Sequence, residues 1–181
     1  AWDRALGKPL IRGESGLDSP TLQVEDVDLT RDTNGVWLHN LVWSSIDAGA
    51  MYDLYWWMTN IRQRPGPDGS VQNGLHEVFK TYKDFMVNVP LSNGNYRSLD
   101  PVVSDGTSVR VLGQKDTVNR RAHAWVQNRK HIWCAVVGGV ANCPYTWDNS
   151  RLSGTLTISG FVPGTAYAAQ WFYFDSTGHV T

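Results

Sequence analysis

The sequence changes its hydrophobic periodicity near residue 92, and this change constrains the fold more than any other feature. Before it, apolar residues at helical spacing alternate with short apolar runs, which predicts the order strand, helix, strand, helix. After it, short alternating runs are separated by turn residues, which is typical of antiparallel strands. Residues 1–91 carry eight basic and twelve acidic side chains, whereas residues 92–181 carry eight and five. We therefore expect two domains, 1–91 and 92–181, joined by the turn-forming Ser92–Asn95.

The first domain is expected to contain two β–α units. The predicted strands cover 8–12 and 50–57, and the predicted helices cover 35–48 and 75–87. Thr33 and Asn34 are the expected caps of the first helix. Two consecutive β–α units imply parallel strands. A pair of strands leaves both sheet edges exposed, so these units need cover from the second domain or from another polypeptide.

The second domain is expected to be an antiparallel β-sandwich. The predicted strands are Thr107–Leu112, Arg121–Gln127, His131–Val137, Leu152–Ser159 and Ala166–Phe174. The predicted turns lie at Asp105-Gly106, at Asn128-Arg129 and at Val162–Gly164.

Composition narrows the classes of partner. The chain has 16 basic and 17 acidic side chains, so its charge gives no basis for binding nucleic acid or an anionic membrane. No apolar run reaches the length of about 18 residues that a membrane-spanning helix needs. The two cysteines, Cys134 and Cys143, either form a local disulfide, which would indicate an oxidising compartment, or remain two thiols. They make a poor zinc site, and we expect neither a metal nor a cofactor.

Glu14 is the residue best placed for chemistry. It follows the first predicted strand and lies between Gly13 and Gly16, where backbone and ligand can approach closely. Functional groups gather at the carboxyl ends of strands in parallel α/β folds. A carboxylate there, near an aromatic strand, suits attack on an anomeric carbon above a tryptophan floor. The alternative is a surface glutamate in a turn.

Three segments carry a resemblance to a known family. KPLIRGESG, at 8–16, resembles the seventh-strand segment of retaining (β/α)8-barrel glycoside hydrolases of the cellulase-like superfamily. Residues 36–61 are similar to the seventh helix and eighth strand, and residues 75–86 to the eighth helix. In the second domain, residues 110–116, 121–133 and 152–161 resemble the β-sandwich that follows the barrel in some bacterial members. The resemblance implies an α/β plus all-β fold, with the last two β/α units of a TIM-type barrel followed by an antiparallel β-sandwich.

The resemblance also implies roles for single residues. Glu14 matches the catalytic nucleophile, Trp57 matches the sugar platform, and Trp56 and Asn60 lie near enough in sequence to bind substrate. A retaining mechanism needs a second carboxyl group about 5–5.5 Å away. In the family an Asn-Glu pair supplies it, and this sequence contains no Asn-Glu pair. The chain alone should therefore not hydrolyse a glycoside.

We thus expect part of a secreted retaining glycoside hydrolase that cleaves β-linked polysaccharide or oligosaccharide. A second polypeptide would supply the missing barrel strands and the acid/base carboxylate.

The rival interpretation is a non-catalytic carbohydrate-binding or structural protein. Trp147, in CPYTWDN beside Tyr145, is the expected exposed platform for a sugar ring. Trp125 and Trp171 lie in strand patterns and are expected in the core. His39 lies in a predicted helix and is expected to be structural.

Overall fold

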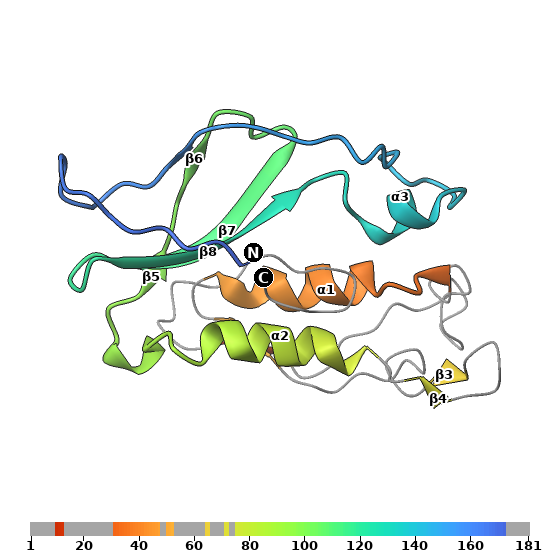
Figure 1. The fold of residues 1–181 in the computed structure, drawn as a ribbon, viewed down its shortest axis with the longest axis horizontal. Coiled ribbons are helices and arrows are strands. Elements are labelled where there is room, and N and C mark those ends of the chain that lie inside the picture. The colour runs from red at the N-terminus through yellow and green to blue at the C-terminus, as the bar shows by residue number, and fades with distance from the viewer. Residues whose placement is uncertain are drawn as a thin grey trace.

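The structure is a computed structural model that describes residues 10–12, 31–47, 50–52, 64–65, 71–72 and 75–172. In this part of the chain the helices α1 (Val36–Trp43) and α2 (His76–Met86) lie side by side, next to the long hairpin of β7 (Val109–Asp116) and β8 (Arg121–Asn128) (Figure 1). The other elements, in chain order, are β1 (Leu10–Arg12), η3 (Ser44–Ile46), β2 (Ala50–Tyr52), β3 (Arg64–Pro65), β4 (Val71–Gln72), η5 (Leu91–Asn93), β5 (Arg97–Ser98), β6 (Val102–Val103), α3 (Trp133–Val137) and β9 (Leu156–Thr157).

Helix α1 forms as predicted, but its cap differs from the prediction. The carboxylate of Asp32, and not Thr33 or Asn34, accepts hydrogen bonds from the backbone N–H groups of Val36 (3.0 Å) and Trp37 (2.8 Å). These amides belong to the first turn, where the helix offers them no partner of its own. Asp32 is itself buried, so a charged acceptor meets the positive end of the helix within the protein.

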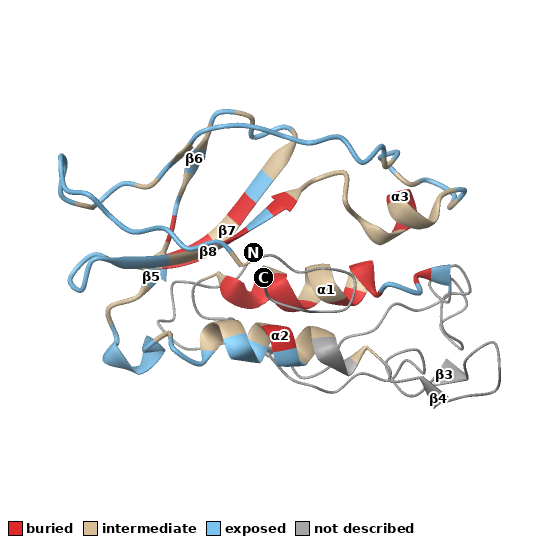
Figure 2. Cartoon of the chain, viewed as in Figure 1, coloured by how far each residue is buried: buried red, intermediate tan, exposed pale blue. Residues whose placement is uncertain are grey.

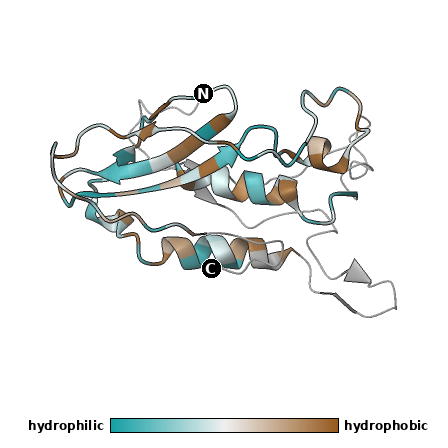
Figure 3. Cartoon of the chain, turned by 45° about the horizontal axis from the view of Figure 1, so that its top comes forward, coloured by the Kyte–Doolittle hydropathy of each residue, from teal (hydrophilic) through white to brown (hydrophobic). Residues whose placement is uncertain are grey.

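Helix α2 follows the predicted amphipathic pattern closely. Its apolar face places Val78, Phe79 and Tyr82 against the buried Leu38 and Val42 of α1. The opposite face carries Lys80 and Asp84, which form an exposed i,i+4 ion pair at 2.8 Å. Figure 3 shows this alternation of hydrophobic and hydrophilic residues along the helix.

An aromatic cluster joins the helices to the β7–β8 hairpin. Trp43 of α1 and Trp125 of β8 are 1% and 6% exposed, and Ile46 of η3 completes the buried centre. The ring of Trp43 meets those of Tyr82 (5.2 Å) and Phe85 (5.3 Å) edge to face, a favourable arrangement for aromatic pairs. Figure 2 shows the buried residues concentrated on α1 and on the middle of the hairpin. This core crosses the predicted boundary at residue 92.

The hairpin has an uninterrupted antiparallel register from Val109↔Asn128 to Asp116↔Arg121. The predicted strand 121–127 is therefore confirmed, whereas the strand predicted at 107–112 begins at Val109 and continues to Asp116. Strand β5 pairs with the other edge of β7. Asp116 closes the turn because its carboxylate accepts bonds from the backbone N–H (2.9 Å) and side chain (2.7 Å) of Asn119. Desolvation raises the pKa of Asp116, but these bonds and one from Asn93 outweigh it, so the pKa lies below its usual value.

The predicted fold class is wrong. Instead of two barrel units followed by a β-sandwich, the described residues form a small, mostly β-rich structure with three helices. Its largest sheet, β5-β7-β8, has three strands. The sheet packs against helices α1 and α2, and these helices take the place that a second sheet would have in a sandwich. In β8, the buried Trp125 packs with Trp43 and Ile46 of the helical layer, while the next residue, Val126, is 42% exposed.

Two of the predicted sandwich strands do not form over their predicted length. Residues 133–137 form α3, and the chain reverses through Gly138 and Gly139 at φ 71° and 67°. This reversal returns Cys143 to Cys134, and the two form a disulfide with their Cα atoms 5.7 Å apart. Leu152–Ser159 yields only the two-residue β9, which pairs with β6.

The predicted strand 166–174 forms no strand over its described residues 166–172. Trp171 is 64% exposed, so its predicted place in the core is also wrong. Trp125, in contrast, is a core residue as predicted.

The strands β1 and β2 pair in parallel, with Leu10 opposite Ala50 and Arg12 opposite Tyr52. The expected parallel orientation of these two strands is therefore found. The pair stands alone as a two-stranded sheet among the described residues, which do not extend it into a barrel. The described helices include none that is long and apolar enough to cross a membrane.

Two histidines lie between the layers. The ring of His39 is 5.9 Å from that of Trp43 and 6.0 Å from that of Trp125, and burial lowers its pKa to about 4. His123 of β8 lies against Tyr96 at 5.3 Å, and burial lowers its pKa to about 4 as well. Both imidazoles are therefore neutral in the folded protein at neutral pH.

The first prediction concerns Gly113, where the two strands of the hairpin approach too closely for a side chain. A Cβ atom at this position would lie 2.2 Å from the carbonyl oxygen of His123 and 2.8 Å from Cα of Ala124. We expect Gly113→Ala to lower the free energy of unfolding by about 1–3 kcal/mol, because backbone atoms must move. Gly106→Ala is the matched control, since its nearest neighbour would be 4.0 Å away. Equal urea midpoints for the two variants would contradict this interpretation of the hairpin.

The second prediction concerns pH. The unfolded chain binds protons at His39 and His123 near pH 6.5, whereas the folded chain binds them near 4. Stability should therefore fall as pH falls from 6.5 towards 4, by up to about 1.4 kcal/mol per pH unit for each histidine. Urea unfolding between pH 4.5 and 7 measures this slope. His39→Gln should reduce the slope and leave the part due to His123, and an unchanged slope would be evidence against the assignment.

Candidate functional site

The predicted catalytic and sugar-binding residues Glu14, Trp56, Trp57 and Asn60 lie outside the described residues. The backbone that precedes them is described, because β1 ends at Arg12 and β2 ends at Tyr52, directly opposite each other. Since the strands are parallel, their carboxyl ends share one edge. Along the sequence, Glu14 follows the first of these ends and Trp56-Trp57 follow the second.

The fifth predicted residue, Trp147, lies within the described chain and is half-buried. Its indole ring meets the imidazole of His131 at a centroid distance of 4.7 Å and an angle of 63°. Trp147 is therefore less exposed than predicted, because part of its ring contacts His131, and its role as a sugar platform stays a prediction. Tyr145, two residues earlier, is 39% exposed.

His131 is held in place through its backbone. Its carbonyl oxygen accepts hydrogen bonds from Nδ2 of Asn40 on α1 (2.8 Å) and from Nε2 of Gln127 on β8 (3.3 Å). These donors come from the two layers of the fold, so the residue that supports Trp147 is fixed to both. The sequence pattern places His131 at the start of a predicted strand and does not indicate this role. No local signal indicates it, because Asn40 is 91 residues from His131 in the sequence.

The charges around Trp147 come from Lys130 and Asp148, whose side chains form an ion pair at 3.1 Å. Hydrogen bonds from Ser150 and then from Lys130 lower the pKa of Asp148 to about 2. Burial lowers the pKa of His131, although the charge of Asp32 opposes the shift. At neutral pH the site therefore offers an aromatic ring, a neutral imidazole, one carboxylate and one ammonium group.

The loop that carries Trp147 is fastened at its base. The Cys134–Cys143 disulfide joins it to α3, and Nη2 of Arg31 donates a 2.8 Å hydrogen bond to the carbonyl oxygen of Gly138. Arg31 immediately precedes Asp32, which caps α1. The loop is thus anchored to the start of the helix that supplies Asn40. A disulfide was one of the two alternatives for the cysteines, and it is the one found.

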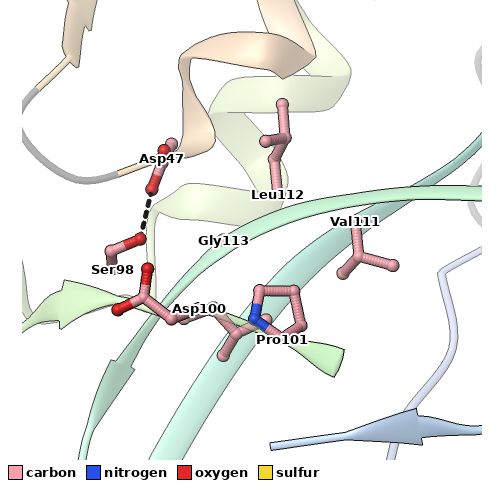
Figure 4. Close-up of a pocket in the computed structure, with 8 residues that line it drawn as sticks. Asp47, Ser98, Asp100, Pro101, Val111, Leu112 and Gly113 are labelled. Atoms are coloured by element: carbon pink, nitrogen blue, oxygen red, sulfur yellow. Dashed lines mark hydrogen bonds between the residues drawn. The ribbon is translucent and has the colours of Figure 1, made fainter. Parts of the chain in front are cut away.

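A separate cavity of about 150 Å³ lies where β5, the link from β5 to β6, and β7 meet the end of η3. Figure 4 shows Asp47 and Ser98 joined at its rim, where Oγ of Ser98 donates to Oδ1 of Asp47 over 3.1 Å. Asp100 lies beside them with a left-handed backbone (φ 44°), and the apolar Val111 and Leu112 line the remainder. Across the described chain, no group of three or more potential ligands could hold a metal ion, and this cavity adds none.

Exposed aromatic surface, polar partners and a fixed scaffold come together around Trp147, His131, Lys130 and Asp148, and we call this group the Trp147 site. Comparison of the chain with protein-family models, with curated proteins and with solved structures found no match.

Proposed function

We propose that this chain is part of a retaining glycoside hydrolase that acts on β-linked polysaccharide or oligosaccharide, with Glu14 as nucleophile. The observation that supports it is the parallel, in-register pairing of β1 and β2. It brings the strand ends that precede Glu14 and Trp56-Trp57 to one edge. A nucleophile and an aromatic sugar platform must meet in this way, and the local family resemblance of 8–16 points to the same chemistry.

In this proposal Glu14 attacks the anomeric carbon while Trp57 stacks beneath the sugar ring, with Trp56 and Asn60 at the rim. The leaving oxygen needs a proton from a second carboxyl group about 5–5.5 Å from the first. We propose that a second polypeptide supplies this group, because the sequence lacks the Asn-Glu pair. Neither a metal nor a cofactor enters the reaction, since the two carboxyl groups supply the nucleophile and the acid.

The third prediction uses a reagent that reacts with the nucleophile without protonation by the second carboxyl group. Aryl 2-deoxy-2-fluoro-β-glycosides carry a good leaving group and trap the covalent glycosyl-enzyme intermediate. With the native assembly that contains this chain, a panel of gluco, manno, galacto and xylo reagents should label the Glu14 peptide in mass spectrometry. Glu14→Gln should abolish the label, and Glu25→Gln, the matched control, should retain it. Failure of the whole panel to label Glu14 would rule out this nucleophile.

A second candidate function is non-catalytic carbohydrate binding at the Trp147 site. The edge-to-face contact with His131 fixes the indole, and the Lys130–Asp148 pair offers hydrogen-bonding groups beside it. Sugar rings present apolar C–H faces and hydroxyl edges, which match an aromatic ring flanked by charged groups. Trp147 is only half-buried and its ring rests against His131, as expected for an aromatic side chain that holds a sugar ring.

The fourth prediction tests that binding. In affinity electrophoresis with soluble mixed-linkage β-glucan, xylan or galactomannan in the gel, we expect retardation of the native protein by at least one of these polymers. Trp147→Ala should weaken binding about tenfold or more, as truncation of a central aromatic contact commonly does. Trp171→Ala removes a more exposed indole and is the matched control. Equal retardation of the two variants would exclude Trp147 as the platform.

A further inference from the structure

The disulfide lies at the point where the Trp147 loop leaves the body of the protein. Cys134 is on α3 and is 8% exposed, whereas Cys143 is half-buried in the loop, four residues before Trp147. Beyond Cys143, the contacts that tie residues 144–150 to the described chain include the Lys130–Asp148 pair and the Trp147–His131 ring contact. The ion pair is exposed and contributes little by itself.

The groups that support the site do not depend on this covalent link. Asn40 and Gln127 bind the carbonyl oxygen of His131, and both belong to the packed helix and sheet. The core around Trp43 and Trp125 lies outside the loop that the disulfide closes. Breaking the disulfide should therefore release the part that carries Trp147 and leave the part that carries His131 in place.

We propose that the Cys134–Cys143 disulfide is a redox control on the Trp147 site: the oxidised form holds Trp147 against His131, and reduction releases it. This inference rests on the second candidate function, carbohydrate binding at that site, for its biological meaning. The structural step itself needs only the disulfide and the ring contact.

The reductant is a dithiol. One of its thiolates attacks Sγ of Cys143, the less buried of the two cysteines, and the Cys134 sulfur leaves as a thiolate that water protonates. The second thiol of the reagent then attacks the mixed disulfide and releases the Cys143 sulfur. Two electrons pass from the dithiol, which becomes a cyclic disulfide, and the protein gains two thiols. Reoxidation by a disulfide of higher potential reverses both steps.

The test is hydrogen exchange of the full chain in its native assembly, with and without dithiothreitol, together with affinity electrophoresis in the same three polysaccharides. Reduction should speed amide exchange of residues 139–149 at least tenfold and leave that of the β7–β8 ladder unchanged. Polysaccharide binding should weaken about as much as in Trp147→Ala. The double variant Cys134→Ser/Cys143→Ser should reproduce both effects without reductant and should not respond to it.

The outcomes separate the two proposals. If exchange of 139–149 is the same in both redox states, or if it increases while affinity for the polysaccharide is unchanged, the redox control is refuted. If the oxidised chain binds none of the three polymers, the carbohydrate-binding proposal fails, whatever the exchange shows. If the β7–β8 ladder also exchanges faster on reduction, the disulfide supports the whole fold and is not a local control.

Discussion

The packing of Trp43 against Tyr82, Phe85 and Trp125 is the interaction on which the described structure depends. It brings α1, α2 and β8 to one centre, and each of the three elements is too short or too one-sided to be stable alone. The same packing leaves the imidazoles of His39 and His123 between the layers, where burial keeps them neutral. The stability of the fold is therefore coupled to protonation through two of the residues that lie between its layers.

Local patterns predicted a described element well where burial of one face determines whether it forms a helix or a strand. The spacing of Leu75, Val78 and Phe79 indicates α2, and the alternation around Trp125 indicates β8. The architecture could not be predicted in the same way, because an alternating strand has the same sequence whether it faces a second sheet or a pair of helices. Residues 132–137 form a continuous apolar run, which suits a buried strand or a helix equally, and the structure forms the short helix α3, which ends before Gly138.

The candidate site shows a similar division. The sequence suggests Trp147 as a candidate because of its loop, and the disulfide is one of two alternatives for the cysteines, but the contact of His131 with Trp147 arises only from tertiary structure. Asn40 is 91 residues and Gln127 four residues from the carbonyl oxygen that they share, so no sequence window contains this arrangement. The predicted nucleophile Glu14 depends instead on local features, a short strand followed by Gly-Glu, and on the parallel partner strand that the structure supplies.

The edge of β1 and β2 and the Trp147 site differ in whether they need groups from another polypeptide. The edge of β1 and β2 is useful only if a second carboxyl group reaches it, because a lone nucleophile cannot protonate a leaving group. The Trp147 site needs no such partner, since its ring, its charges and its anchors all come from residues 31–150. Under these two proposals, binding at Trp147 would persist in a chain that cannot hydrolyse, and loss of the proposed hydrolysis would not entail loss of the proposed binding. A protein in which both act would hold substrate through Trp147 while a partner completes the reaction at Glu14.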